Sequence, residues 1–286
     1  METVPLNTDR GPSIPEHKSI IEKIKHVFSK SGGKRRMRLM AAQRTDVGLK
    51  RQHNEDTVAY IIPKDQEILA TKGALFVVAD GMGGHAAGEV ASEMAVSTLT
   101  TLYYQDEGDA PECLLRSIKY ANAIIFQKAM ENIEHNGMGT TCVAAVLLRE
   151  TAYIANVGDS RAYLIHKGQV RQISQDHSWV AEQVRAGAMS EADARQHEMR
   201  NMITRSLGSL PEVEVDIFTE MVLEGDTLVL CSDGLSGMIS DNEILTIVER
   251  YSPQESVYRL IDRANACGGN DNITVLVVRI AFIRGF

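Results

Sequence analysis

Four short stretches of this sequence place an aspartate in or beside a turn, next to an apolar run. They are "VVADGMGG" with Asp80, "NVGDSRAY" with Asp159, "LVLCSDGL" with Asp233 and "GGNDNITVLVV" with Asp271. Hard cations such as Mg²⁺ and Mn²⁺ prefer carboxylate, carbonyl and water oxygens as ligands. Rigid strand ends can hold several carboxylates close together, and a cation relieves their repulsion. The pattern predicts a metal site with oxygen ligands, in which histidine and cysteine take little part.

A fifth stretch, "KRQHNEDTVAY", adds an arginine and further acids. Arg51 stands four residues before Glu55, ahead of another predicted strand. The planar guanidinium of arginine donates to two oxygens of one anion at once, which lysine cannot do. Gly81, directly after Asp80, has no side chain to block its carbonyl, so that oxygen is a further candidate ligand. Each motif alone is an ordinary turn, and only the ordered set favours a reaction site.

Apolar runs and their spacing predict the elements that hold these residues. Runs rich in Val, Ile, Leu and Thr predict strands at 74–79, 140–148, 151–158, 161–168, 226–234 and 272–280. Helical spacing predicts helices at 86–104, 111–134, 241–250 and 253–267. Short polar turns favour antiparallel pairing, and elements that come in blocks favour an α+β fold over a doubly wound sheet. The long polar segment 175–210 predicts a partly helical flap inserted between strands.

Length and composition place the chain among ordinary globular proteins. Its 286 residues are 44% hydrophobic and 24% charged, enough for a sizeable core. No apolar run reaches the length of a membrane-spanning helix, and the first residues lack the layout of a secretory signal. The four cysteines have no CxxC spacing. We therefore expect a protein of the reducing cytoplasm.

The net charge of −8 is unevenly distributed. Residues 1–38 hold nine Lys and Arg against four Asp and Glu, so the remainder is strongly acidic. An acidic body would repel phosphate backbones, which disfavours a nucleic-acid partner. We predict that residues 1–38 form a basic, partly disordered extension before a domain at 39–286. A short amphipathic helix at 18–30 could contact a membrane surface or a partner, or pack on the domain itself, and these alternatives stay open.

The ordered motifs resemble the metal-dependent serine/threonine phosphatases of the PPM/PP2C type, in their compact bacterial form. The resemblance covers about residues 40–280. Its motifs are "GLKRQHNEDTV", "ADGMGGHAAGEVAS", "MGTT", "IANVGDSRAYL", "SQDHSWV", "TRSLG", "LCSDGL" and "GGNDNITVLVV". The implied fold is a four-layer α-β-β-α sandwich of two mainly antiparallel sheets flanked by helices, with the flap as an insertion.

The resemblance also implies a role for each candidate residue. Asp80 would bridge two Mn²⁺ or Mg²⁺ ions, and the carbonyl of Gly81 would bind the second. Asp233 and Asp271 would complete the first site, and Glu55 would bind the second ion directly or through water. The other implied roles are a weaker third metal on Asp159 and Asp233, a substrate-phosphate contact from Arg51, and supporting positions for Asp56 and Asn272.

The implied reaction is hydrolysis of phosphoserine and phosphothreonine in proteins by a water activated between the metals. The implied partners are phosphorylated proteins and a cognate bacterial Ser/Thr kinase, and the implied state is a monomer. One departure concerns the proton for the leaving group. Many eukaryotic relatives have a histidine where this chain has Met82, and His85 is better suited to a helix start or the surface. We expect that proton to come from water.

Four other functions fit the same motifs less well. A catalytically inactive binding module is disfavoured because every implied metal position is filled. A narrower enzyme acting on one anti-sigma-factor antagonist shares the fold, but the complete "GDSR" and flap motifs favour the kinase-paired type. A metal-dependent nuclease is disfavoured by the acidic body. A cysteine phosphatase is disfavoured because no arginine follows Cys231 at the required spacing.

Overall fold

The computed structural model describes residues 35–83, 87–131 and 137–284. The predicted helix at 18–30 and His85 lie outside these residues. The chain divides into two units, Met1–Arg36 with Ile283–Phe286 and Met37–Phe282, and the fold described here is that of the second. Strand β1 covers Arg35–Asp46, so the boundary predicted at residue 39 falls inside a strand. Within the described ranges, no helix is long and apolar enough to span a bilayer.

Two sheets form the centre of the fold. The first has five strands in the order β1-β11-β10-β7-β8. Its further strands are β11 (Ile273–Arg284), β10 (Thr227–Cys231), β7 (Arg161–His166) and β8 (Gln169–Gln172). The pairs β10–β11, β10–β7 and β7–β8 are antiparallel. Short connections such as the β7–β8 turn permit this pairing, as the sequence predicted.

The second sheet has the order β2-β3-β5-β6-β9, and β4 pairs with β3 beside it. Its strands are β2 (Asp56–Ile61), β3 (Ala74–Met82), β4 (Gly139–Thr140), β5 (Cys142–Leu148), β6 (Thr151–Val157) and β9 (Asp216–Met221). All of these pairs are antiparallel. Strands β1, β8 and β9 were not predicted from the sequence.

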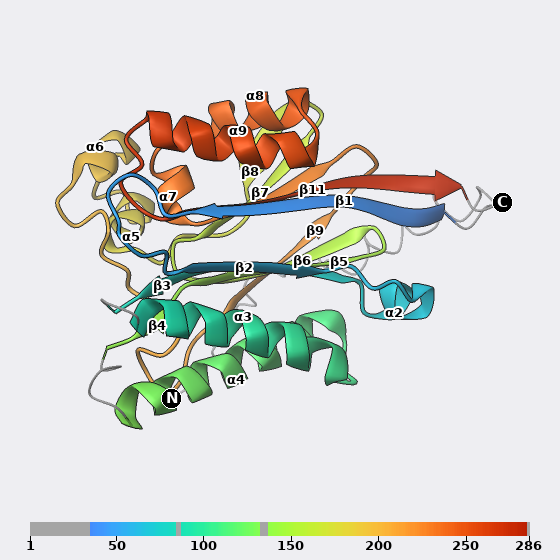
Figure 1. The fold of residues 1–286 in the computed structure, drawn as a ribbon, viewed down its shortest axis with the longest axis horizontal. Helices are drawn as coiled ribbons and strands as arrows, with labels where there is room; N and C mark the ends of the chain where they lie inside the picture. The colour runs from blue at the N-terminus through green and yellow to red at the C-terminus, as the bar shows by residue number, and fades with distance from the viewer. Residues whose placement is uncertain (1–34, 84–86, 132–136, 285–286) are drawn as a thin grey trace, which may run out of the picture. The chain divides into compact units, whose positions relative to one another are not determined.

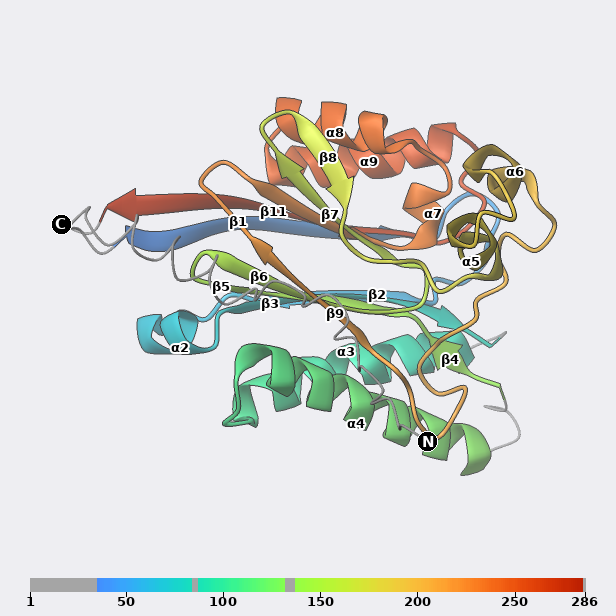
Figure 2. The same cartoon turned by 180° about the vertical axis from the view of Figure 1, so that it is seen from behind.

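Helices cover the outer face of each sheet (Figure 1). The helices on the second sheet are α3 (Ala87–Gln105) and α4 (Ala110–Glu131), and those on the first are α8 (Asp241–Arg250) and α9 (Pro253–Ala266). Figure 2 shows the same four layers from behind. The short helices are α2 (Gln66–Thr71), α5 (Trp179–Arg185), α6 (Glu191–Gln196) and α7 (Asp233–Ser236). The predicted α+β sandwich of two antiparallel sheets flanked by helices is confirmed.

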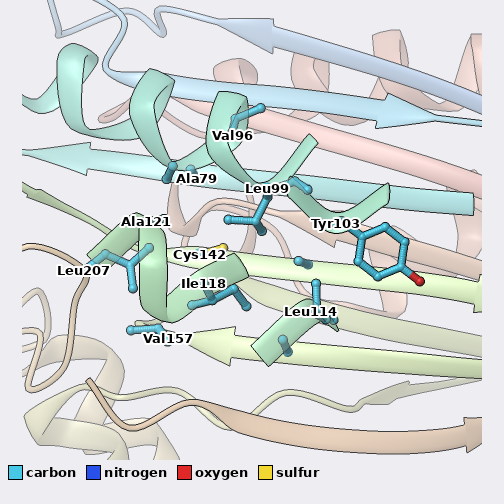
Figure 3. Close-up of a cluster of buried hydrophobic side chains, with 14 of the residues drawn as sticks. Ala79, Val96, Leu99, Tyr103, Leu114, Ile118, Ala121, Cys142, Val157 and Leu207 are labelled. Atoms are coloured by element: carbon cyan, nitrogen blue, oxygen red, sulfur yellow. The ribbon is translucent and has the colours of Figure 1, made fainter. Parts of the chain in front are cut away.

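Strand β3 shows how the layers are held together. Successive side chains of a strand point to opposite faces. Leu75 and Val77 accordingly pack with α3 and α4, whereas Phe76 and Val78 pack between the two sheets. Figure 3 shows the first of these clusters, in which Leu99 from α3 lies near the strands of the second sheet. Both faces of β3 are buried, which explains why its apolar run is continuous rather than alternating.

Local signals explain where several elements begin and end. Helix α9 begins after Ser252, whose hydroxyl accepts from the Glu255 amide at 3.3 Å, with Pro253 in the first turn. That predicted start is confirmed. The strand predicted at 226–234 is too long, because β10 ends at Cys231 and Asp233 begins helix α7. The carboxylate therefore lies at a helix start rather than on a strand.

Candidate active site

Strands β2 and β3 bring two of the predicted motifs together. Asp56 lies opposite Asp80 in the antiparallel register of these strands. The Gly81 amide donates to the Glu55 carbonyl at 3.1 Å. Residues from the "NED" and "DGMGG" motifs therefore meet at one end of the second sheet, as a shared metal site requires.

The backbone at Gly81 is packed too closely for any side chain. A Cβ atom on this residue would lie 2.1 Å from the Gly88 carbonyl oxygen and 2.5 Å from that of Glu55. The first turn of α3 and Glu55, the residue before β2, therefore pack directly against the end of β3. Glycine is needed here because only hydrogen fits. This explains the glycine-rich sequence after Asp80 in terms of packing.

Asp233 and Asp271 meet at the neighbouring end of the first sheet. The Ser232 amide donates to the Thr274 carbonyl at 3.1 Å, which extends the β10–β11 pairing past Cys231. A Cβ on Gly234 would lie 2.0 Å from the Asn272 carbonyl oxygen. The start of α7 is therefore packed against the turn before β11, and this contact brings the two aspartates near each other.

Ser232 connects the two sheets at the site. Its fully buried hydroxyl donates to Asp56 Oδ2 at 2.8 Å and accepts from the Thr274 amide at 3.0 Å. The interaction couples the Asp80 end of one sheet to the Asp233 end of the other. Sequence reasoning missed Ser232, although a small polar residue between a buried strand and a candidate ligand was a usable signal.

Asn272 holds the loop that carries Arg51. Its side-chain oxygen accepts from the Glu55 amide at 2.8 Å. Its side-chain nitrogen donates to the carbonyls of Val47 at 3.0 Å and His53 at 2.9 Å. The loop from residue 47 to residue 55 is thus tied to the turn before β11. The amide group acts on the Arg51 loop and on Glu55, in addition to its place next to Asp271.

Arg51 reaches the acidic cluster directly. Its Nη2 donates to Asp271 Oδ2 at 2.8 Å, and the arginine side chain is half exposed. The hydrogen bond to Asp271 raises the pKa of Arg51 above its ordinary value. The guanidinium therefore lies at the mouth of the cluster, charged and in contact with solvent.

The carboxylates of the cluster lie close enough to resist ionisation together. Burial, followed by the charge of Asp56 and then of Asp233, raises the pKa of Asp80 well above its ordinary value. Burial and then Asp233 raise the pKa of Asp159, and burial and then Asp271 raise that of Asp233. Mutual repulsion of this kind is typical of a site that binds a cation or a proton.

The donor set of the cluster suits a hard divalent cation. The candidate ligands are all oxygens, and Asp56 Oδ1 and Asp159 Oδ1 are buried without a hydrogen-bond partner. Buried polar atoms without a partner are costly unless an ion or water binds them. In the described part of the chain, no three Asp, Glu, His or Cys side chains converge on a single point.

The metal-free protein is expected to lose stability as pH rises. Burial raises the pKa of Asp56 from 3.8 to about 7. At pH values between these two, Asp56 holds a proton in the folded state and is ionised in the unfolded chain. Its contribution to the free energy of unfolding is therefore fully present below about pH 4 and is lost as pH rises through about 7. Thermal unfolding in EDTA should show Asp56→Asn raising the Tm relative to wild type by several degrees at pH 8 but not at pH 4. An equal difference at both pH values would contradict the assignment.

The Asp159 turn is fastened to the base of the flap. The Gly158 amide donates to His177 Nδ1 at 3.0 Å, and the His177 amide donates to the Gly158 carbonyl at 2.9 Å. Arg161 forms an ion pair with Asp176 at 2.7 Å. These contacts give His177 and Arg161 structural roles at the base of the flap. The flap contains α5 and α6, in agreement with its predicted partial helicity.

Comparison with known proteins decides the family. A family model described as protein phosphatase 2C matches residues 50–274, which include every candidate ligand. The chain belongs to the protein phosphatase 2C family. Serine/threonine phosphatase stp of Listeria welshimeri is 42% identical over 241 residues, which cover 82% of this chain and 93% of that protein. The predicted identity as a PP2C-type protein serine/threonine phosphatase is confirmed.

Solved structures of PP2C phosphatases share the fold. Stp1 from Staphylococcus aureus matches with a TM-score of 0.77 at 35% identity, covering 87% of this chain and 96% of that one. The catalytic domain of the phosphatase PstP matches with a TM-score of 0.75 at 36% identity, covering 86% and 100%. That PstP structure contains two manganese ions.

Proposed function

We propose that this PP2C phosphatase hydrolyses phosphoserine and phosphothreonine esters with two divalent cations held at the Asp80 cluster. The observation that supports it most is the meeting of buried, mutually repelling carboxylates from both sheets beside the exposed guanidinium of Arg51. A divalent cation would relieve the repulsion between these carboxylates, and a neighbouring arginine suits a phosphate group. The family and the manganese-containing PstP structure support the same assignment.

The proposed ligands follow from position. Asp80, at the centre of the cluster, would bridge the two ions, and the Gly81 carbonyl would bind one of them. Asp233 and Asp271 would bind the other ion. Glu55 would bind the same ion as the Gly81 carbonyl, directly or through water. When bound, such cations lower the pKa of a water and neutralise charge on phosphoryl oxygens.

The chain's own residues would hold the substrate and keep the site in place. Arg51 uses Nη2 on Asp271, and a guanidinium has five N–H donors, so other donors can bind the phosphoryl oxygens. Asn272 would keep this arginine in position through its bonds to the loop carbonyls. Met82 cannot donate a proton, so we assign protonation of the leaving oxygen to solvent.

Further parts of the proposal concern partners and cofactors. We propose Mn²⁺ or Mg²⁺ as the ions, with a third, weaker site at Asp159 and Asp233. The substrates would be phosphorylated proteins of a cognate Ser/Thr kinase in the cytoplasm, and the enzyme would act as a monomer. The relative from Listeria welshimeri, named a serine/threonine phosphatase, supports this substrate class.

Phosphate release from a phosphothreonine peptide tests the proposed function. Purified protein is expected to release phosphate with Mn²⁺ and to release none in EDTA, and a panel with phosphoserine and phosphotyrosine peptides defines the class. Hydrolysis of phosphotyrosine alone, or equal rates with Mn²⁺ and EDTA, would refute the proposal. Replacing Mn²⁺ by Mg²⁺ at several concentrations identifies the preferred ion.

A further inference from the structure

Thr141 contacts the backbone of Asp80 in a way that an ordinary strand residue does not. The two residues lie opposite each other where β3 passes from β5 to β4, and the Thr141 amide donates to the Asp80 carbonyl at 2.8 Å. A regular antiparallel pair would return a bond from the Asp80 amide to the Thr141 carbonyl. Here the Asp80 amide instead donates to the Thr141 hydroxyl at 3.0 Å.

The neighbouring threonine stabilises this exception. The Thr140 hydroxyl lies 2.9 Å from the Asp80 carbonyl and 2.9 Å from the Thr141 carbonyl, and can donate to either. When it donates to the Thr141 carbonyl, that oxygen is satisfied outside the ladder. Both threonines are fully buried. Both lie at the start of the strand predicted at 140–148, and their side-chain contacts are additional to that position.

The Thr141 hydroxyl also reaches the Asp159 turn. It lies 2.8 Å from the Ser160 hydroxyl, which is fully buried. Because the Thr141 oxygen accepts from the Asp80 amide, its own hydrogen is available for Ser160. The chain of contacts thus runs from the backbone of Asp80 to the residue that follows Asp159.

We propose that Thr141 is a positioning residue, whose hydroxyl fixes the Asp80 backbone and links it through Ser160 to the Asp159 turn. The inference rests on the proposed function, because it concerns how two groups of proposed ligands are held relative to each other. Thr141 touches neither substrate nor ion in this account. Partners that orient ligands without binding the ion themselves are often needed for full metal affinity.

Three variants and a matched control test the role. Thr141→Val removes the hydroxyl at nearly constant volume, Thr141→Ser keeps it, and Ser160→Ala removes only its partner. Ser117→Ala is the control, because this buried hydroxyl donates to the Cys113 carbonyl at 2.8 Å within α4. The measurements are Mn²⁺ affinity of the metal-free protein by calorimetry, kcat and KM with p-nitrophenyl phosphate, and circular dichroism.

Thr141→Val is expected to weaken Mn²⁺ binding and lower kcat by about tenfold or more, with a smaller change in KM. Thr141→Ser should retain most of both properties, and Ser160→Ala should show a smaller loss in the same direction. The double variant Thr141→Val/Ser160→Ala should lose no more than Thr141→Val alone, since Ser160 acts through Thr141.

Several outcomes would overturn the inference. It is wrong if Thr141→Val binds Mn²⁺ and turns over substrate like Ser117→Ala, or if Thr141→Ser fails as badly as Thr141→Val. If Thr141→Val does not fold, Ser160→Ala becomes the deciding variant. Unchanged Mn²⁺ affinity in Ser160→Ala would then refute the proposed link from Thr141 through Ser160 to the Asp159 turn. Failure of the wild type to bind Mn²⁺ at all would instead refute the proposed function.

Discussion

Replacing Asp80 by asparagine is expected to abolish catalysis while making the metal-free protein more stable. Asparagine keeps the shape of the side chain but removes the charge that would bridge two cations. The lost stabilisation of the transition state is several kcal/mol, which corresponds to a fall in kcat on the order of 10³-fold. The measurement is phosphate release from a phosphothreonine peptide at saturating Mn²⁺.

The same substitution should raise stability although it lowers activity, and both effects come from loss of the Asp80 charge. Burial and the neighbouring carboxylates raise the pKa of Asp80, so the folded protein disfavours its charged form at neutral pH. Without metal, Asp80→Asn should therefore raise the Tm. With Mn²⁺, the wild type should gain more stability than the variant, because ion binding to the folded state adds to stability.

A matched control separates this effect from a general one. Asp65 caps helix α2 and accepts from the Glu67 amide at 2.7 Å, and asparagine is an equally good cap. Asp65→Asn should leave both kcat and the response of Tm to Mn²⁺ unchanged. Full activity of Asp80→Asn, or a lower Tm than wild type in EDTA, would contradict the account of the cluster.

Replacing Arg51 by lysine is expected to lower kcat/KM for a phosphopeptide by roughly 100-fold, although the positive charge remains. Lysine offers a single ammonium in place of a planar fork, so it cannot hold two phosphoryl oxygens while contacting Asp271. The loss should appear in kcat as well as KM, because the charge on those oxygens is greatest in the transition state. Steady-state kinetics over a range of peptide concentrations separates the two parameters.

Arg171→Lys supplies the control for this substitution. Arg171 also forms a two-pronged pair, with its Nη atoms 3.0 and 2.7 Å from the carboxylate oxygens of Glu220 on β9. This pair joins two edge strands away from the Asp80 cluster, and its loss should leave kcat/KM unchanged. An Arg51→Lys variant with the activity of Arg171→Lys would exclude Arg51 from phosphate binding.

The sequence indicated which carboxylates lie close together better than it indicated the elements that carry them. Asp80, Asp233 and Asp271 lie in short motifs whose order is specific, so their meeting could be predicted before the fold was known. Strand β1 was missed because its first residues, "RRMR", read as a basic cluster rather than as a strand. The edge strand β9 has only six residues, all of them half-buried or exposed, which gives a weak signal.

The supporting contacts could not be predicted because they depend on register and side-chain direction. Ser232 joins two sheets, and no local pattern shows which strands will face each other. The Thr141 hydroxyl accepts from the Asp80 amide, where a regular antiparallel pair would use the Thr141 carbonyl. A run of strand-forming residues gives no sign of this exception. Asn272 was predicted to occupy a supporting position, but the sequence could not show that its longest-range contacts hold the Arg51 loop and Glu55.

Anomalous diffraction from Mn²⁺-soaked crystals of the full chain tests the central claim most directly. Two strong peaks are expected at the Asp80 cluster, both in contact with the Asp80 carboxylate. One should also contact the Gly81 carbonyl and the other Asp233 and Asp271. A peptide-hydrolysing protein with no peak at Asp80, or with peaks only elsewhere, would contradict the account.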